Sequence, residues 1–141
     1  MAALKYWVWL TTLPGLGERA KLQLLAHFGS PEEIYFAPEG ELLRAEGITK
    51  LQAALLADKS LDRAEKVLED CAKDGQFLLT MDDAGYPARL RNIYDPPLLL
   101  YGKGSLPLFD DEVAVTVVGT RDCTPYGVRA ASQLGYELAR Q

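Results

Sequence analysis

The sequence has few of the residues that carry metal or nucleophilic chemistry. It contains two cysteines, Cys71 and Cys123, and one histidine, His27. The cysteines lie far apart without metal-ligand spacing, and a disulfide framework needs denser cysteine, so we expect a reduced, cytoplasmic protein. His27 falls among Leu, Ala and Phe on an expected helix, where packing is commoner than a zinc site or a catalytic triad. We therefore predict no metal and no cofactor.

Long apolar runs and a strongly basic region are also missing. No stretch reaches the ~20 apolar residues of a membrane span, and no basic segment precedes an apolar run at the N-terminus. The net charge of the 141 residues is −5, with 8 basic and 11 acidic side chains in residues 1–72 and 7 and 9 in residues 73–141. A bound polyanion would therefore have to be held by a local patch. A content of 48% hydrophobic and 25% charged residues predicts a folded globular chain.

The pattern changes in character near residue 73, which predicts two domains and a mixed α+β or α/β fold. Residues 1–72 show helical spacing of apolar side chains and helix caps such as Ser30-Pro31, so we expect an all-helical domain. Residues 75–141 alternate short apolar strands with turns. The last strand, "VAVTVVG", ends at Gly119 and leads into a helix. This order predicts the beginning of a Rossmann-like domain.

Two glycine turns in the helical domain are candidate phosphate contacts. Leu13-Pro14-Gly15-Leu16-Gly17 and the weaker Glu46-Gly47-Ile48-Thr49 are similar to tandem helix-hairpin-helix motifs of DNA repair proteins. Glycines there let main-chain amides at a helix N-terminus face a phosphate, which makes Gly15, Gly17 and Gly47 candidate contacts. The alternative is that these glycines only turn one helix onto the next.

The junction between the last strand and the last helix is the main candidate site. Gly119 permits close approach of the main chain to an anion, Thr120 offers a hydroxyl and an amide, and Arg121 offers a planar guanidinium suited to phosphate. Thr124 is the expected helix cap, with Pro125 at the first helical position. The dinucleotide fingerprint G-x-G-x-x-G is not met, so NAD is not predicted. The alternative role for Arg121 is a salt bridge on a loop.

A third candidate is the tyrosine-rich stretch of residues 85–104. Tyrosines could stack on bases beside the basic side chains of this stretch, as in single-strand binding surfaces. Packing of these tyrosines at the edge of a sheet is the favoured interpretation. The residues concerned are Tyr86, Tyr94, Tyr101, Arg89, Arg91 and Lys103.

Two long motifs in residues 75–141 closely resemble the DNA-processing protein A family, also called Smf. The first is Tyr86-Pro87-x-x-Leu90-x-x-Ile93-x-Asp95-Pro96-Pro97-x-x-Leu100-Tyr101-x-x-Gly104. The second is Val-Val-Gly119-Thr120-Arg121-x-x-Thr124-x-Tyr126-Gly127. Residues 1–72 suit that family's N-terminal sterile-alpha-motif-like (SAM-like) or helix-hairpin-helix domain.

The resemblance implies a binding protein of natural transformation, without catalytic activity. Such proteins bind and protect incoming single-stranded DNA, help load the RecA recombinase and displace single-strand-binding protein. They are homodimers built on an extended Rossmann fold, with a Gly-Ser/Thr-Arg motif that grips the DNA backbone and corresponds here to Gly119, Thr120 and Arg121. The family's Rossmann domain is longer than residues 75–141, so the resemblance implies that this chain is part of a longer product.

Two alternatives remain at the level of sequence. One is a nucleotide-binding Rossmann enzyme of the phosphoribohydrolase, or lysine-decarboxylase-like, type, although its P-G-G-x-G-T motif is not present. The other is a helix-hairpin-helix module that binds duplex DNA through residues 1–72. Dimer geometry and the surface that contacts RecA do not follow from the sequence.

Overall fold

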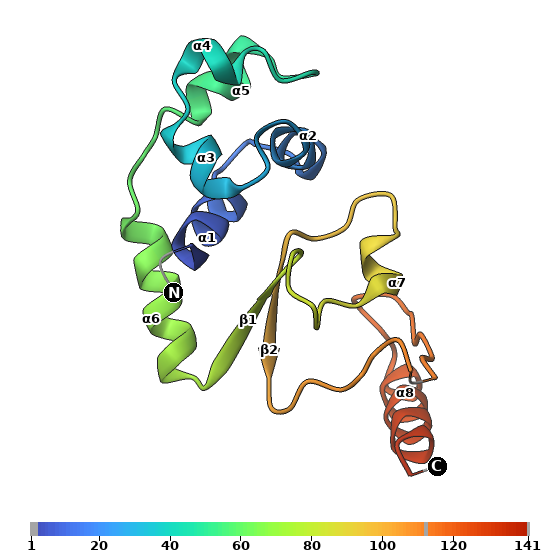
Figure 1. The fold of residues 1–141 in the computed structure, drawn as a ribbon. Coiled ribbons are helices and arrows are strands. Elements are labelled where there is room, and N and C mark those ends of the chain that lie inside the picture. The colour runs from blue at the N-terminus through green and yellow to red at the C-terminus, as the bar shows by residue number, and fades with distance from the viewer. Residues whose placement is uncertain (1–2, 112, 141) are drawn as a thin grey trace. The chain divides into compact units, whose positions relative to one another are not determined.

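A computed structural model describes residues 3–111 and 113–140 and contains helices with one small sheet (Figure 1). The chain divides into two compact units, Met1–Asp110 and Asp111–Gln141. The combination of helices and an antiparallel sheet confirms the predicted α+β class at this level. The SAM-like and Rossmann-like assignments stay predictions.

The first unit contains seven of the described helices and both described strands. The domain boundary predicted between residues 72 and 75 falls inside this unit, after its sixth helix, and that boundary stays a prediction. The elements are α1 (Leu4–Thr12), α2 (Glu18–Phe28), α3 (Pro31–Phe36), α4 (Glu39–Leu42), α5 (Lys50–Leu55), α6 (Asp62–Lys73), β1 (Gln76–Thr80), α7 (Ala88–Arg91) and β2 (Leu99–Lys103).

Helix α1 is the centre of the core. It packs against α3, α6 and β2, and five consecutive side chains, residues 6–10, are buried. A helix that is apolar on all sides has to be enclosed, which explains why other elements surround it. The indole Nε1 of Trp9 donates to the main-chain oxygen of Asp58 at 2.9 Å, so its one polar atom is satisfied.

The cap predicted at Ser30-Pro31 is observed, and two other helix ends are also satisfied by local groups. Ser30 Oγ accepts a hydrogen bond from the Glu33 amide at 3.2 Å, with Pro31 at the start of α3. Thr49 and Gln52 form a reciprocal capping box at the start of α5. Gly29 ends α2 with a φ of 87°, a conformation that a side chain would strain.

Strands β1 and β2 pair antiparallel, with Gln76 opposite Lys103 and Leu78 opposite Tyr101. Phe77 lies over Gly102, where a Cβ would come within 2.1 Å of the phenyl Cζ, so this position of the ring requires glycine. Leu98 and Leu99 belong to the same apolar core as the helices. The strands are therefore part of the helical core.

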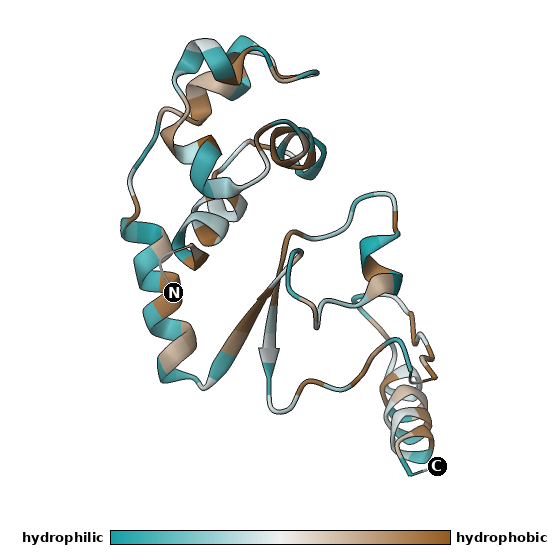
Figure 2. Ribbon diagram, viewed as in Figure 1, coloured by the Kyte–Doolittle hydropathy of each residue, from teal (hydrophilic) through white to brown (hydrophobic). Residues whose placement is uncertain are grey.

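The second unit consists of an extended segment followed by α8 (Pro125–Leu138). Figure 2 shows hydrophobic residues recurring along α8. None of the residues described in α8 is buried, and Val128 and Leu134 are exposed. The unit thus carries an apolar helix face that nothing in the unit covers.

The strand predicted over residues 113–119 is not present, and that prediction is wrong for this structure. The segment has no regular secondary structure, and Val113 and Val118 are 92% and 86% exposed. A strand requires hydrogen bonds from a neighbouring strand, and no described residue pairs with this segment. The alternating valines predict β structure correctly only where a partner strand is available.

Candidate nucleic-acid interface

The segment from Gly119 to Thr124 presents its polar groups to solvent. No heavy atom lies within 4 Å of the position that a Cβ on Gly119 would occupy, so the main chain is open to approach there. The Thr120 hydroxyl donates to the main-chain oxygen of Asp122 at 3.2 Å. The main chain at Gly119 is therefore accessible, and the Thr120 hydroxyl beside it is held by a hydrogen bond within the segment.

Arg121 is exposed, and within residues 3–111 and 113–140 no hydrogen bond or ion pair engages its guanidinium. The competing prediction, a salt bridge on a loop, is not observed in this part of the chain. A guanidinium without an internal carboxylate keeps its full hydrogen-bonding capacity for an external phosphate.

Thr124 caps α8, as the sequence predicts. Its hydroxyl accepts a hydrogen bond from the Gly127 amide at 3.2 Å, and Pro125 is the first helical residue. The N-terminus of this helix carries partial positive charge and lies next to Arg121 in the sequence. The Thr124 hydroxyl accepts a hydrogen bond in this cap and keeps its own O–H for donation, so its contact with phosphate stays a prediction.

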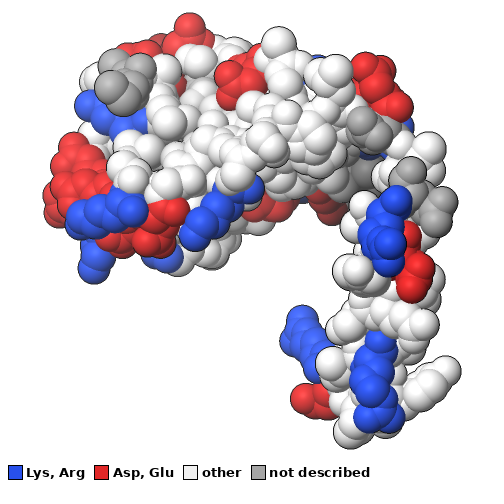
Figure 3. All heavy atoms as spheres, turned by 90° about the horizontal axis from the view of Figure 1, so that it is seen from below, with Lys and Arg blue, Asp and Glu red and all other residues white. Residues whose placement is uncertain are grey.

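Charge around this segment is close to balanced. Residues 113–140 contain three basic side chains, Arg121, Arg129 and Arg140, against two acidic ones, Asp122 and Glu137. On the face drawn in Figure 3, basic and acidic side chains of the first unit are intermixed. Affinity for a polyanion would therefore depend on local contacts more than on a broad positive field.

The buried side chain of Lys21 stabilises the first glycine turn, residues 13–17. Gly15 has a φ of 80°, and Gly17 precedes α2 without a side-chain cap. Lys21 is 3% exposed, and its Nζ donates to Thr11 O at 3.1 Å and to Glu18 Oε1 at 2.8 Å. The carboxylate of Glu18 therefore lies in the first turn of α2, where a phosphate would have to bind.

The second hairpin has fewer available donors. Gly47 has a φ of 78°, and a Cβ there would come within 2.6 Å of the Gln23 amide group. The amides of Thr49 and Gln52 already bond to each other's side chains at 2.8 and 3.3 Å. Gly15, Gly17 and Gly47 thus occupy helix-helix turns, and their contact with phosphate stays a prediction.

The tyrosines of residues 85–104 have different environments. Tyr86 is buried, and its hydroxyl donates to Pro97 O at 2.7 Å, as the packing interpretation expects. Burial raises the pKa of the Tyr86 hydroxyl, and the nearby Arg91 partly opposes this shift. Tyr94 is 80% exposed and receives a hydrogen bond from Arg19 Nη1 at 2.8 Å. These side chains do not form one stacking surface.

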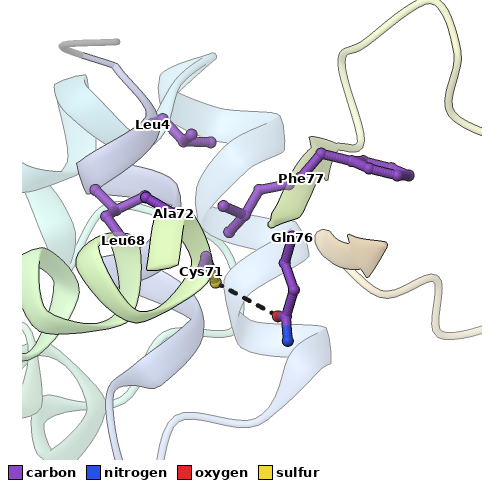
Figure 4. A pocket seen from close by; sticks show the side chains of 7 residues that line it. Leu4, Leu68, Cys71, Ala72, Gln76 and Phe77 are labelled. Carbon is purple, nitrogen blue, oxygen red and sulfur yellow. Dashed lines mark hydrogen bonds between the residues drawn. The ribbon is translucent and has the colours of Figure 1, made fainter. Parts of the chain in front are cut away.

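The first unit also contains an apolar pocket of about 300 Å³ between α1, α6 and β1 (Figure 4). The Cys71 thiol lies at its wall, 3.7 Å from Gln76 Oε1. The pocket has no charged lining group. It is lined by Leu4, Leu68, Cys71, Ala72, Gln76, Phe77 and Leu78.

The described part of the chain contains no candidate metal centre and no membrane-spanning helix. No group of three or more His, Cys, Asp or Glu side chains there could hold a metal ion. His27 is exposed in the last turn of α2, with its ring 4.7 Å from that of Phe28. None of the helices in residues 3–111 and 113–140 is long and apolar enough to cross a membrane.

Sequence analysis missed Asp110, whose side chain reaches back to α7. Its carboxylate accepts hydrogen bonds from the amides of Ala88 and Arg89 at 2.8 and 3.2 Å. These bonds hold the pKa of the Asp110 carboxyl below its usual value, and the charge of Arg89 contributes less. The only signal in the sequence was a run of three acidic residues, 110–112, after a loop, and no local pattern connects it to a helix 22 residues earlier.

Comparison with known proteins gives a consistent result. Residues 77–141 match the family model described as DNA recombination-mediator protein A. The chain is 33% identical over 76 residues to DNA processing protein DprA of Bacillus subtilis (strain 168), covering 54% of the chain and 26% of that protein. It is 27% identical over 139 residues to Protein Smf of Synechocystis sp. (strain ATCC 27184 / PCC 6803 / Kazusa), covering 96% of the chain and 35% of that protein.

The chain spans about a quarter to a third of the length of these curated relatives. The match to the family model includes both the tyrosine-proline motif and the Gly119–Thr124 junction. The Synechocystis relative extends the similarity through the N-terminal helices. No solved structure gave a significant match to the chain.

Proposed function

The chain belongs to the DNA-processing protein A (DprA/Smf) family, and from this premise we propose that it binds single-stranded DNA during natural transformation. In this proposal it acts in the cytoplasm, protects incoming strands, helps to load the RecA recombinase and displaces single-strand-binding protein. It does so as a homodimer and without catalysis.

The observation that carries the proposal is the exposed guanidinium of Arg121, which no residue in the described part of the chain engages. It projects from an exposed segment in which Gly119 leaves the main chain open. Arginine can bind two phosphate oxygens at once, and main-chain amides near a helix N-terminus add further donors. Contacts of this kind hold the nucleic-acid backbone without reading bases. They therefore suit a protein that has to accept strands of any sequence.

The balanced charge of residues 113–140 sets an expectation for affinity. With three basic and two acidic side chains, this segment can neutralise few phosphates. The logarithm of the binding constant for a single strand falls with the logarithm of salt concentration by about 0.7 per neutralised phosphate. We therefore expect a shallow salt dependence to which a single arginine contributes measurably.

The experiment is a titration of fluorescently labelled oligo-dT with the full chain at several salt concentrations. Arg121→Ala should weaken binding and flatten the salt dependence by roughly 0.7 to 1, because one phosphate contact is lost. Arg129→Ala is the matched control, since it removes the same charge from α8 and should leave the slope unchanged. An equal slope for the wild type and Arg121→Ala would remove Arg121 from the contact.

Duplex binding through the first hairpin is the second candidate. It is favoured by the positive φ of Gly15 and the uncapped start of α2, and disfavoured by the carboxylate of Glu18 in that turn. The same titration with a labelled duplex separates the two candidates. Duplex affinity that matches or exceeds single-strand affinity, with no effect of Arg121→Ala, would favour the hairpin.

The proposal assigns no catalytic role, in contrast to a phosphoribohydrolase. Nucleoside monophosphates incubated with the full chain should therefore yield no free base, as followed by chromatography. Release of base above a protein-free control would favour the enzyme alternative.

A further inference from the structure

We propose that Asp110 is a positioning residue for the DNA-binding junction, because it fastens the chain to α7 where the first unit ends. The inference rests on the proposed function for the role of the junction. The attachment of Asp110 to α7, called the fastening below, is made only by contacts within the first unit. Asp110 is not expected to touch DNA.

The side chain and the main chain of Asp110 are both engaged. Its two carboxylate oxygens accept hydrogen bonds from the amides of Ala88, at 2.8 Å, and Arg89, at 3.2 Å. Its main-chain oxygen accepts a hydrogen bond from Arg89 Nη2 at 2.8 Å, and Arg89 Nε lies 3.9 Å from Oδ1. Four atom pairs therefore join one residue to the start of α7.

Asp110 supplies a cap that α7 does not have locally. The residue at the N-cap, Pro87, makes no side-chain hydrogen bond to the first turn. A carboxylate is the most favourable group at a helix N-terminus, because it accepts from free amides and is attracted to their partial positive charge. The capping group comes from a distant part of the sequence, so forming the cap closes the intervening loop.

Helix α7 is itself anchored to the rest of the first unit. Arg91 Nη2 donates to Met81 O at 2.9 Å and to Asp83 O at 3.3 Å, and its guanidinium lies 5.4 Å from the centre of the Tyr86 ring. Tyr86 is 2% exposed and bonded to Pro97. The Asp110 fastening is therefore made to a fixed part of the fold.

The preceding chain lies along the same surface. A Cβ on Gly85 would come within 2.9 Å of Leu106 Cδ2, which shows how closely this segment passes over the turn before α7. Beyond Asp110 the described chain has no regular structure until α8 begins at Pro125. Without the fastening, the free segment before Arg121 would begin near the end of β2 at Lys103. A longer free segment gives Arg121 more conformational freedom, so more conformational entropy is lost when its side chain binds a phosphate.

The test compares Asp110→Ala with Asp111→Ala in the full chain. Both variants remove one negative charge, but Asp111 makes no hydrogen bond or ion pair in the described part of the chain. Amide hydrogen exchange at Ala88 and Arg89 should become at least about threefold faster in Asp110→Ala alone, because only that variant removes the cap. Circular dichroism at the same temperature shows that each variant is folded, and Asp110→Asn, which keeps one acceptor oxygen, should give intermediate exchange.

Binding of labelled oligo-dT supplies the second measurement. Asp110→Ala should bind about twofold more weakly than Asp111→Ala, because the free segment before Arg121 is longer, and the salt slope should be unchanged because no phosphate contact is lost. If only the lost negative charge mattered, the two variants would have the same affinity for oligo-dT, and that affinity would equal or exceed that of the wild type. Equal affinity of the two variants would overturn the positioning role, and unchanged exchange would overturn the fastening. Absence of oligo-dT binding by the wild type would instead contradict the proposed function, while the exchange measurement still decides the fastening.

Discussion

At the scale of single residues, charged groups have different roles according to whether a partner lies within the fold. Lys21 is buried and satisfied by Thr11 and Glu18, whereas Arg121 is exposed and has no partner within the described ranges. A buried ammonium has to be compensated internally, so Lys21 is structural. The free guanidinium is the group available for binding.

Replacing Lys21 tests this structural role. Lys21→Ala should lower the free energy of unfolding by about 1–3 kcal/mol, since it leaves the Thr11 carbonyl and the Glu18 carboxylate without their donor. The measurement is urea denaturation followed by tryptophan fluorescence. Lys66→Ala, an exposed lysine on α6, is the control and should change stability by less than about 0.5 kcal/mol. Equal effects of the two changes would contradict the role of Lys21.

The lowered pKa of Asp110 predicts how the fastening to α7 depends on pH. A carboxyl whose pKa is lower in the folded state stabilises that state above its unfolded pKa and loses this contribution as the pH falls through the folded pKa. The bonds to α7 should therefore be complete at neutral pH and break below the usual value of 3.8. An NMR titration should show the Ala88 amide shift changing with a midpoint below that value, and a midpoint at or above 3.8 would contradict the geometry.

At the scale of elements, short helices in this protein depend on their caps. Helix α5 has six residues, too few to be stable alone, and its first turn is satisfied by the reciprocal bonds of Thr49 and Gln52. Helix α7 has four residues and receives its cap from Asp110. The cap of α5 is local and can be predicted from the sequence, whereas the cap of α7 comes from a residue that is distant in the sequence.

Removing the local cap should have a measurable cost. Thr49→Ala should destabilise the folded state by about 1 kcal/mol, because the Gln52 amide loses its acceptor and the capping box is broken. Thermal or urea unfolding measures the change. Ser105→Ala, which alters an exposed hydroxyl outside any helix, should have little effect, and a loss of comparable size there would contradict the capping argument.

At the scale of the whole molecule, the two units differ in how they are stabilised. The first unit has a continuous apolar core to which helices α1 to α6 and the strand β2 contribute. The second unit exposes its valines and the apolar residues of α8. Stability is therefore concentrated in residues 1–110, and the segment beyond Asp110 should open most easily.

Limited proteolysis of the full chain tests this difference. The first cleavages should fall in residues 113–124, which are exposed and outside helices and strands, and should leave a resistant fragment that ends a short way beyond Asp110. Mass spectrometry of the early fragments identifies the cleavage sites. Initial cleavage between α6 and β1 would instead support a separate helical domain of residues 1–72.

Much of the local structure could be predicted from the sequence. The caps at Ser30 and Thr124, the turn at Gly15, and the strands β1 and β2 follow from residue types at short spacing. Arg121 could be selected because arginine after a glycine at the end of an apolar segment is typical of phosphate contacts. Such signals act over a few residues, so they can be seen without knowing the fold.

The remaining features depended on tertiary structure, because they join residues that are distant in sequence. Whether residues 113–119 form a strand depends on a neighbouring strand, and none is present in the part of the chain that the structure describes. The burial of Lys21, the packing of Tyr86 under Arg91 and the cap from Asp110 to α7 all arise from contacts that no local pattern encodes. The sequence alone determined which groups could bind a phosphate, and the tertiary structure decided which of them are already engaged, since only folding brings their partners within bonding distance.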